Sequence, residues 1–542
     1  MFLIRFRIMP PTSRMDDTLI IDRPPDAHRN FSTKKLWFLW VISLALLLAT
    51  IGMPPVTRTQ EARVLETARQ MLGTGPQGWL IPHLNGEIRL KKPPLCYWMT
   101  AAAYQIGGVS ETAGRIPDAI LGWLTIGLTL VFARNLFDNR AALLAAGAML
   151  GSFIFFRFTR LAETDAAATP FITLACFAIY RGLGDSRVRW MHLAAAAMGL
   201  VVMTKGPPAL FVVAFLLAIA WVESRWDLPL RFLRSGAIIT FILIAAPWYA
   251  YIFTKVGIGA FEAELRNTAG GGDHFDWPWV YIPGMLVATA PWSAFLPLAL
   301  LAAARQWRTN RSTRLTLVWL LSILIPLCIN GNKQNHYLIM AMPPTMVLIG
   351  VFFANLSDNL RNLTSRLMLA TAIGAIAAAL AAPPLIARGR GQLLPIDIIA
   401  AIVLGMIGVL VCIGLRKGLE RAIPWTIAAV AMAMPILLGA WIPSFEPHSA
   451  RQAAAEINQV YPDQQFVYYG PDSSLTLCFY LRRAIPTMRT DEQLLSAARP
   501  GLVAISIGKR GSSPPALPGP FKYHLTVEHQ SELLFLYDCQ TP

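Results

Sequence analysis

Charged and polar side chains stand between long apolar runs at several points of this chain. The first such segment carries Glu61 and Arg63 on a stretch with a helical pattern, and Lys92 follows it. Carboxylates can accept protons and cations can neutralise anions, and ionisable groups near hydrocarbon are costly unless they are paired or functional. We therefore treat the set as a candidate functional site, to which later segments add Asp165, Lys205, Glu262, Arg266, His274, Lys333 and Tyr337.

A purely structural role is the alternative to a functional role at each of these positions. A single charged residue at a membrane surface can equally snorkel or form an interfacial ion pair. We interpret Glu66, Arg69 and Glu163 in this way, as solvated or structural residues.

The elements that would position these residues are transmembrane helices. Runs of about 17 to 25 apolar residues are long enough to cross a hydrocarbon layer of about 30 Å. Mean hydropathy is +0.48, and only 14% of the residues are charged, compared with about 25% in soluble domains. We predict a polytopic α-helical protein with about 13 spans, at 36–53, 112–133, 141–156, 165–180, 190–203, 208–222, 235–253, 279–304, 315–329, 337–354, 367–386, 395–415 and 423–442.

The distribution of basic residues predicts the orientation. The formal charge of +16 could suggest a nucleic-acid partner, but the basic residues gather in the N-terminal tail and in alternate loops. With the N-terminus inside, the tail and inside loops carry about three times as many Lys and Arg as the short outside loops. We expect a multi-pass protein of a bacterial-type inner membrane, with a cytoplasmic N-terminus, an external or periplasmic C-terminus and no nucleic-acid partner.

Three regions follow from this pattern. Residues 1–35 form a cytoplasmic basic tail and residues 36–442 the transmembrane domain, whose first external loop, 54–111, carries juxtamembrane helices. Residues 443–542 are predicted to form an external soluble α/β domain. Its expected elements are helices at 450–460 and 490–498 and strands at 465–469 and 501–507.

The loop lengths limit the possible functions. The inside loops are too short for a Rossmann-type nucleotide domain, and the sequence has no Walker A motif. An activated substrate used by the outside loops would have to arrive through the membrane, attached to a lipid. Two alternatives remain open, a transporter of a lipid-linked or small solute and a catalytically silent scaffold, although the spans lack the midplane charges and repeats of many transporters.

The motifs resemble those of a known family. The order of the acidic helix, Pro82-His83-Leu84-Asn85-Gly86, Lys91-Lys92-Pro93-Pro94-Leu95-Cys96-Tyr97-Trp98 and Thr204-Lys205-Gly206-Pro207 is similar to that in polyprenyl-phosphate-dependent GT-C glycosyltransferases. Among them it most resembles the aminoarabinose transferases that modify lipid A, within the superfamily that includes protein O-mannosyltransferases. The resemblance covers nearly the whole chain. It implies a GT-C fold, a polyprenyl phosphate sugar donor, a lipid or glycolipid acceptor, and hexosyl or pentosyl transfer on the external face.

The resemblance also implies roles for individual residues. Glu61 and Asp165 match acidic positions and are the candidate catalytic carboxylates. The remaining matches, expected to bind substrate, are Arg63, Lys92, Lys205, Glu262, Arg266, His274, Lys333 and Tyr337. Of these, Lys92, Arg266, His274 and Lys333 would hold the leaving phosphate, because its charge must be neutralised as the sugar departs.

Two positions depart from the family pattern. Gln60 stands where the family usually has an aspartate, which puts the identity of the base in doubt. Lys91 stands where the aminoarabinose enzymes have a glutamate that helps to hold a metal, which puts a divalent metal in doubt. The sequence itself has no CxxC or HExxH spacing. Cys478 and Cys539 share the predicted external domain, where a disulfide is allowed but not required.

Overall fold

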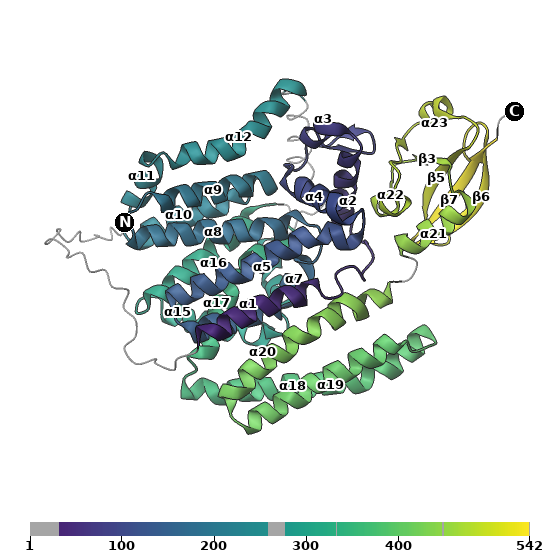
Figure 1. Ribbon diagram of the computed structural model, residues 1–542. Coiled ribbons are helices and arrows are strands. Elements are labelled where there is room, and N and C mark those ends of the chain that lie inside the picture. Colours follow the sequence, from purple (N-terminus) through teal and green to yellow (C-terminus); the bar gives the residue numbers. More distant parts are fainter. Residues whose placement is uncertain (1–31, 258, 260–276, 332, 447–448, 541–542) are drawn as a thin grey trace, which may run out of the picture.

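A computed structural model describes residues 32–257, 259, 277–331, 333–446 and 449–540 of the chain. A body of long helices lies beside a smaller unit of strands and short helices that is formed by the C-terminal residues (Figure 1). Among the described residues, eight helical segments are long and apolar enough to cross a membrane. They are Glu111–Leu136, Thr164–Gly184, Ala237–Lys255, Arg311–Ile329, Asn335–Ala354, Leu360–Arg390, Pro395–Arg416 and Leu419–Phe445. The chain is a multi-pass membrane protein.

The eight segments contain helices α5, α8, α12 and α16 to α20. Here η3 (Asn335–Ala341) runs into α17 (Met342–Ala354), α18 spans Asp358–Arg390, and α20 (Leu419–Ile436) continues through η4 (Leu437–Trp441) into η5 (Ile442–Phe445). The other helices of the body are α1 (Thr33–Leu48), α6 (Asn139–Leu150), α7 (Phe153–Phe158), α9 (Arg189–Thr204), α10 (Ala209–Val222), α11 (Asp227–Arg234), η1 (Pro278–Val280), α14 (Tyr281–Thr289), η2 (Trp292–Ala294) and α15 (Leu296–Arg305). Every predicted span overlaps one or more helices, but several of these are short, so the number thirteen stays a prediction.

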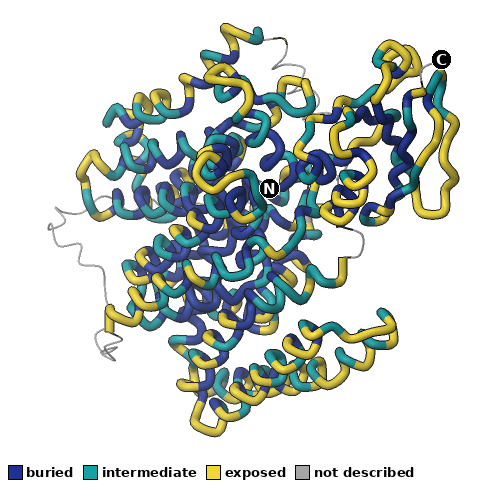
Figure 2. Tube along the Cα trace, turned by 45° about the vertical axis from the view of Figure 1, so that its right-hand side comes forward, coloured by how far each residue is buried: buried dark blue, intermediate teal, exposed yellow. Residues whose placement is uncertain are grey.

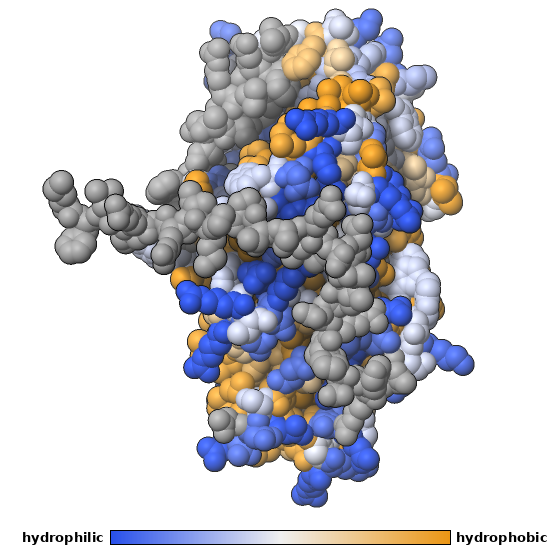
Figure 3. Space-filling model, turned by 90° about the vertical axis from the view of Figure 1, so that its left-hand side faces the viewer, coloured by the Kyte–Doolittle hydropathy of each residue, from blue (hydrophilic) through white to orange (hydrophobic). Residues whose placement is uncertain are grey.

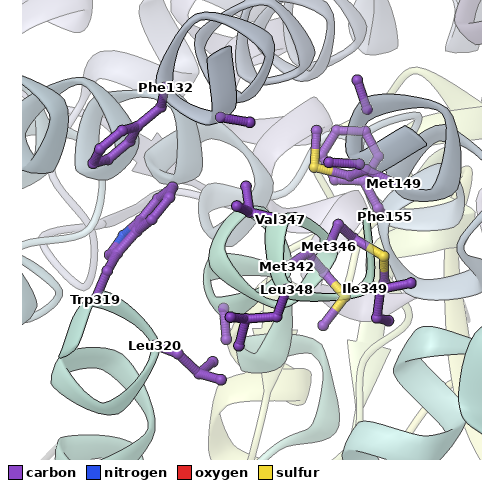
Figure 4. Close-up of a cluster of buried hydrophobic side chains, with 14 of the residues drawn as sticks. Phe132, Met149, Phe155, Trp319, Leu320, Met342, Met346, Val347, Leu348 and Ile349 are labelled. Carbon is purple, nitrogen blue, oxygen red and sulfur yellow. The ribbon is translucent and has the colours of Figure 1, made fainter. Parts of the chain in front are cut away.

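The core of the body forms around α17. Phe132 of α5 stacks on Trp319 of α16, with ring centroids 4.5 Å apart, and α17 turns its methionines toward neighbouring helices (Figure 4). Gly350 lets α17 approach α6, because a Cβ there would lie 2.6 Å from the backbone nitrogen of Ala145. This close packing fixes the helices whose ends carry the polar residues.

Helices α18 and α19 form a hairpin at the edge of the body. Most of its surface is exposed (Figure 2), as expected for apolar helices covered by lipid. The end of the bundle that faces left in Figure 1 shows many hydrophilic residues where the grey atoms do not cover it (Figure 3). The basic residues in the helix ends, the short helix α11 and the connecting loops at this end include Arg134, Arg140, Arg187, Arg189, Arg225, Arg231 and Arg234.

The first loop folds into short helices at the opposite end. Helix α2 (Thr59–Leu72) packs on α4 (Leu95–Gly107) through Leu65 and Ala101. Between them lie α3 (Gly75–Leu80) and a small hairpin of β1 (His83–Leu84) and β2 (Glu87–Ile88). Asn85 and Gly86 both have positive φ, which suits the tight turn of this hairpin.

The C-terminal unit is a five-stranded mixed sheet with short helices. Its strand order is β4-β3-β5-β7-β6, with β3 parallel to β4 and β5 and the remaining pairs antiparallel. The four elements expected here are all present at or near the predicted positions. The bounds are α21 (Ala450–Val460), β3 (Gln465–Tyr469), α22 (Leu475–Leu481), β4 (Thr487–Met488), α23 (Asp491–Ala497), β5 (Leu502–Lys509), β6 (Phe521–His529) and β7 (Glu532–Cys539).

The unit docks on the first loop. The backbone N–H of Val56 donates to the Tyr480 hydroxyl at 2.7 Å, and Arg451 pairs with Glu111 at 2.6 Å. Cys478 and Cys539 are both free thiols. They belong to different apolar clusters, which explains why the allowed disulfide does not form.

Helix α8 gives a direct test of topology. Its 21 residues separate Asp165, in its first turn, from exposed Ser186, just beyond its end, by about 30 Å. We expect Ser473→Cys to react with a membrane-impermeant maleimide on intact cells and Ser186→Cys to react only after lysis, with the unsubstituted chain as the background. Labelling of Ser186→Cys from outside would contradict the predicted orientation.

Candidate active site

A charged pocket of about 440 Å³ lies where four loops meet. The first loop, the start of α8, the end of α9 and η3 all contribute to its walls. They bring together Arg63, Lys92, Asp165, Lys205 and Tyr337 of the predicted site. The full lining is Gln60, Arg63, Val64, Arg89, Lys92, Tyr97, Glu163, Thr164, Asp165, Lys205, His336 and Tyr337.

Asp165 lies at the centre of the pocket's contacts. It stands in the first turn of α8, where the positive end of the helix dipole favours a carboxylate. One carboxylate oxygen accepts a hydrogen bond from the Lys205 ammonium, and the other lies 3.7 Å from Nε2 of His336. Only 4% of Asp165 is exposed, so its charge depends on these partners.

Lys205 enters the pocket where α9 ends. Gly206 follows it with a φ of +82°, which turns the chain away from the helix axis. The Lys205 ammonium also lies over the ring of Tyr337, 3.9 Å from its centroid. The Tyr337 ring and the Asp165 carboxylate therefore fix this cation from two sides.

Lys92 reaches the pocket from the segment between β2 and α4. Its ammonium has no hydrogen bond or ion pair with the part of the chain that the structure describes. Burial and the neighbouring Lys205 lower the pKa of Lys92 to about 8. Lys92 is thus an unneutralised cation in a pocket wall, available to an anionic ligand.

Two sides of helix α2 face different environments, one the charged pocket and the other Arg115. Gln60 and Arg63 line the charged pocket, and Arg63 donates to the Gln60 amide oxygen at 3.3 Å. Glu61, one residue along and turned by about 100°, instead accepts hydrogen bonds from Arg115 at 2.6 and 3.2 Å. The position where the family has an aspartate therefore faces the pocket as an amide, whereas Glu61 lies outside its lining.

Glu163 is a pocket residue that sequence reasoning missed. It is 3% exposed and pairs with Arg58 at 2.6 Å, and its backbone N–H points at the Asp118 carboxylate, 3.4 Å away. Burial raises the pKa of Glu163 to about 7, although Arg58 works against the shift. The available signal was its spacing of two residues from Asp165, which places both carboxylates at the mouth of α8.

Other residues complete the comparison with the predicted site. His336 and Arg89 were not among the predicted substrate-binding residues but line the pocket. Lys333 is buried, donates to the carbonyl of Asn330 and lies outside the pocket lining. The predicted residues Glu262, Arg266 and His274 lie outside the described residues.

A divalent metal can be tested against the residues present. Glu163, Asp165 and His336 each bring a possible ligand atom within 4.8 Å of the others, and such donors suit a divalent cation. However, Arg58 and Lys205 already pair with the two carboxylates, and exposed Lys91 stands where the family's metal-holding glutamate would be. The charge balance does not fit a resident metal.

The pocket combines excess positive charge with two buried carboxylates. Cations converging from separate elements suit a phosphate, and a carboxylate with a pKa near neutrality suits proton transfer. The charges are held before any ligand arrives, as electrostatic catalysis requires.

Comparisons with known proteins show which family the chain resembles. The family model described as "Dolichyl-phosphate-mannose-protein mannosyltransferase" matches residues 91–251. An uncharacterized protein of Aquifex aeolicus is 30% identical over 59% of this chain and 64% of its own length. An undecaprenyl phosphate-alpha-4-amino-4-deoxy-L-arabinose arabinosyl transferase of Aeromonas hydrophila is 28% identical over 60% of each chain. The alignments thus span about three fifths of these curated relatives.

The fold has a solved counterpart over nearly its whole length. The crystal structure of ArnT from Cupriavidus metallidurans bound to undecaprenyl phosphate superposes with a TM-score of 0.74 at 20% identity, covering 93% of this chain and 98% of that one. At this identity the likeness shows the fold alone. In sequence and in fold, the chain resembles the ArnT-like GT-C glycosyltransferases, as its motifs predicted.

Proposed function

We propose that this protein is an integral membrane glycosyltransferase that moves a sugar from a polyprenyl phosphate donor to a lipid acceptor, lipid A-like or other, on the external face of the membrane. The observation that carries the proposal is the charged pocket, in which four cations surround two buried carboxylates. The relatives whose names specify undecaprenyl phosphate aminoarabinose transfer support the same class of donor. Thirteen spans, an external C-terminal unit and an inner-membrane location belong to this proposal.

The donor phosphate would bind among the cations of the charged pocket. Lys92 brings an unneutralised charge, Lys205 is held by Asp165, and Arg63 and Arg89 line the adjacent wall. Tyr337 would orient the donor beside Lys205. Because negative charge grows on the phosphate as the sugar leaves, these cations stabilise the transition state more than the bound donor.

Transfer needs a base as well as a leaving group. The acceptor hydroxyl oxygen attacks the anomeric carbon, the bond from that carbon to the phosphate oxygen breaks, and its electron pair stays with the phosphate. The hydroxyl proton must pass to a carboxylate. We assign this role to Glu163, whose pKa lies near neutrality, and we assign to Asp165 the positioning of Lys205.

This assignment predicts a bell-shaped pH dependence. Glu163, with a pKa of about 7, must lose its proton to act as a base, whereas Lys92, with a pKa of about 8, must keep its own to bind phosphate. The value of kcat/KM for the donor reports groups of the free enzyme, so it should rise through about pH 7 and fall above about pH 8. Glu163→Gln should remove the acidic limb. A flat profile between pH 6 and 9 would contradict both roles.

The function can be tested with purified protein in detergent. We expect undecaprenyl phosphate to be released from an undecaprenyl phosphate sugar only when bacterial membrane lipids are added, as measured by mass spectrometry. Release without an acceptor, at the same rate, would indicate hydrolysis. No release with any donor would favour the transporter or scaffold alternatives.

A further inference from the structure

The charged pocket has two sides of different composition. On one side Lys205 is held by Asp165 and by the ring of Tyr337, and Lys92 is close enough to sense the charge of Lys205. We call this the lysine side. On the other side, which we call the arginine wall, the lining residues are Gln60, Arg63, Arg89 and Tyr97. The lysine side accounts for the donor phosphate and leaves open what the arginine wall binds.

Three elements of the first loop place the arginine wall. Gln60 and Arg63 are three residues apart on α2 and therefore share a face of the helix. Arg89 follows the strand β2, and its backbone N–H donates to the Pro82 carbonyl at 2.8 Å. Tyr97 lies in the first turn of α4 and is only 1% exposed. The packed part of the loop thus holds the wall in place before any ligand arrives.

The side chains of the arginine wall have hydrogen-bond donors left over. Arg63 donates to the Gln60 carbonyl at 3.3 Å, which leaves the amide nitrogen of Gln60 as a donor. Arg89 donates to the Tyr97 hydroxyl oxygen at 3.3 Å, and the hydroxyl proton has no acceptor among the described residues. A ligand of this wall must therefore supply acceptors.

The arginine wall also carries uncompensated positive charge. Neither Arg63 nor Arg89 forms an ion pair with the described part of the chain, since the two carboxylates of the pocket pair with Arg58 and Lys205 instead. Burial and the neighbouring Arg89 lower the pKa of Arg63, and an anion beside the two arginines would offset both effects. Two guanidinium groups from separate elements favour a carboxylate, to which each can donate two parallel hydrogen bonds.

The donor phosphate does not balance the pocket by itself. Once the two carboxylates are paired, the cations left over are Arg63, Arg89 and Lys92. A polyprenyl phosphate sugar is a phosphodiester with a single negative charge. Because the sugar is bonded directly to this phosphate, its ring substituents are the donor groups that lie nearest to the lysine side. An acidic substituent on the sugar would supply both the acceptors and the charge that the arginine wall lacks.

The identity of residue 60 sets the sign of the charge that the arginine wall prefers. The relatives named for aminoarabinose transfer have in their names a sugar with a basic nitrogen, which is a cation at neutral pH. A carboxylate at position 60 would attract such a cation. Gln60 has no charge to offer, and Arg63 and Arg89 beside it repel a cation.

We infer that the arginine wall binds the sugar of the donor and that this sugar carries a carboxylate, as a uronic acid does, with Arg63 and Arg89 as its ligands and Tyr97 as a further donor. The inference rests on the proposed function and adds the chemical class of the sugar. The sugar carboxylate takes no part in bond breaking. It contributes binding and selectivity, and charge repulsion excludes amino sugars.

The test compares donors that differ in one substituent and needs no turnover. Undecaprenyl phosphate is linked to glucose, to glucuronic acid or to 6-amino-6-deoxyglucose, and in a second series to the galactose counterparts. Native mass spectrometry gives the dissociation constant of each donor for the purified full-length protein. In at least one series we expect the carboxylate donor to bind about tenfold more tightly than the neutral donor, and the amino donor to bind more weakly. A carboxylate donor that binds no more tightly than the neutral donor in both series would overturn the inference.

Substitutions assign the preference to the arginine wall. Arg63→Ala and Arg89→Ala should each remove most of the preference for the carboxylate donor, and Arg63→Lys should keep part of it. Gln60→Asp should reverse the order and favour the amino donor. Lys92→Ala is the matched control, because it removes one cation of the same pocket from the lysine side. It should weaken all three donors and keep their ratio, and loss of the preference in Lys92→Ala as complete as in Arg63→Ala would show that only the net charge of the pocket acts.

Undecaprenyl phosphate without a sugar separates the possible failures. If the unsubstituted protein binds neither this lipid nor any donor, the proposed function fails. If it binds the lipid and all donors but does not distinguish the charge of the sugar, the donor site stands and the carboxylate inference alone fails.

Discussion

Replacing Lys92 with alanine is expected to lower sugar transfer by about 100- to 1,000-fold, because a preorganised charge that meets a developing oxyanion contributes on this scale. Lys92 reaches the pocket without a partner among the described residues, so the substitution removes a phosphate ligand and leaves no carboxylate unpaired. Folding should therefore be retained. Turnover with saturating donor measures the effect on the rate of transfer, and the dissociation constant for undecaprenyl phosphate measures the effect on phosphate binding.

Neighbouring lysines provide matched controls for this substitution. Lys91→Ala changes an exposed residue next to Lys92 and should retain nearly full transfer. Lys333→Ala should have a smaller effect than Lys92→Ala, because Lys333 binds the Asn330 carbonyl outside the pocket lining. Equal activity in Lys92→Ala and Lys91→Ala would show that Lys92 only extends its ammonium toward water.

Substituting glutamine for Glu163 should lower the transfer rate by about 100- to 10,000-fold, the usual contribution of a general base. Donor binding should change little, since the amide has the size of the carboxylate but cannot accept the proton. The measurements are single-turnover transfer and undecaprenyl phosphate binding. Asp165→Asn should differ by weakening donor binding as well, because Asp165 holds Lys205 in place.

Glu61→Gln is the informative comparison for Glu163→Gln. Glu61 and Arg115 are almost fully buried, and removing one partner of such a pair costs about 3–5 kcal/mol of stability. We expect Glu61→Gln to lower the thermal unfolding temperature while the folded fraction still transfers sugar. A stable Glu61→Gln protein without activity, together with an active Glu163→Gln protein, would return the role of the base to Glu61.

The hydrophobic pattern predicted the type of fold because the apolar surface of each long helix must either pack against other helices or face the lipid. It could not predict span lengths, since α6 has 12 residues and α7 only six and both are buried against neighbours. In the C-terminal unit, amphipathic patterning located the helix Ala450–Val460 and the strand Gln465–Tyr469. Local patterns sufficed there because each element has one face on the sheet or the core.

The candidate site was predictable in part. The types and order of Lys92, Asp165, Lys205 and Tyr337 indicated a common site, and the structure places all four around one pocket. The sequence could not predict which side of α2 lines the pocket. Gln60 faces the pocket because Glu61 pairs with Arg115, which lies 54 residues from Glu61. Glu163 was missed for a similar reason. An acid at a helix mouth is commonly solvated, and only the distant Arg58 and Asp118 make it a buried pocket residue.

The most direct test of the central claim follows two labels in one reaction. Purified protein is given an undecaprenyl phosphate sugar with tritium in the sugar and ³²P in the phosphate, together with bacterial membrane lipids, and the lipid products are separated. Glycosyl transfer predicts that tritium moves to an acceptor lipid while ³²P stays with the polyprenyl chain, since the bond between the anomeric carbon and the phosphate oxygen breaks. Transfer of both labels to the acceptor, or of neither, would contradict the proposed function.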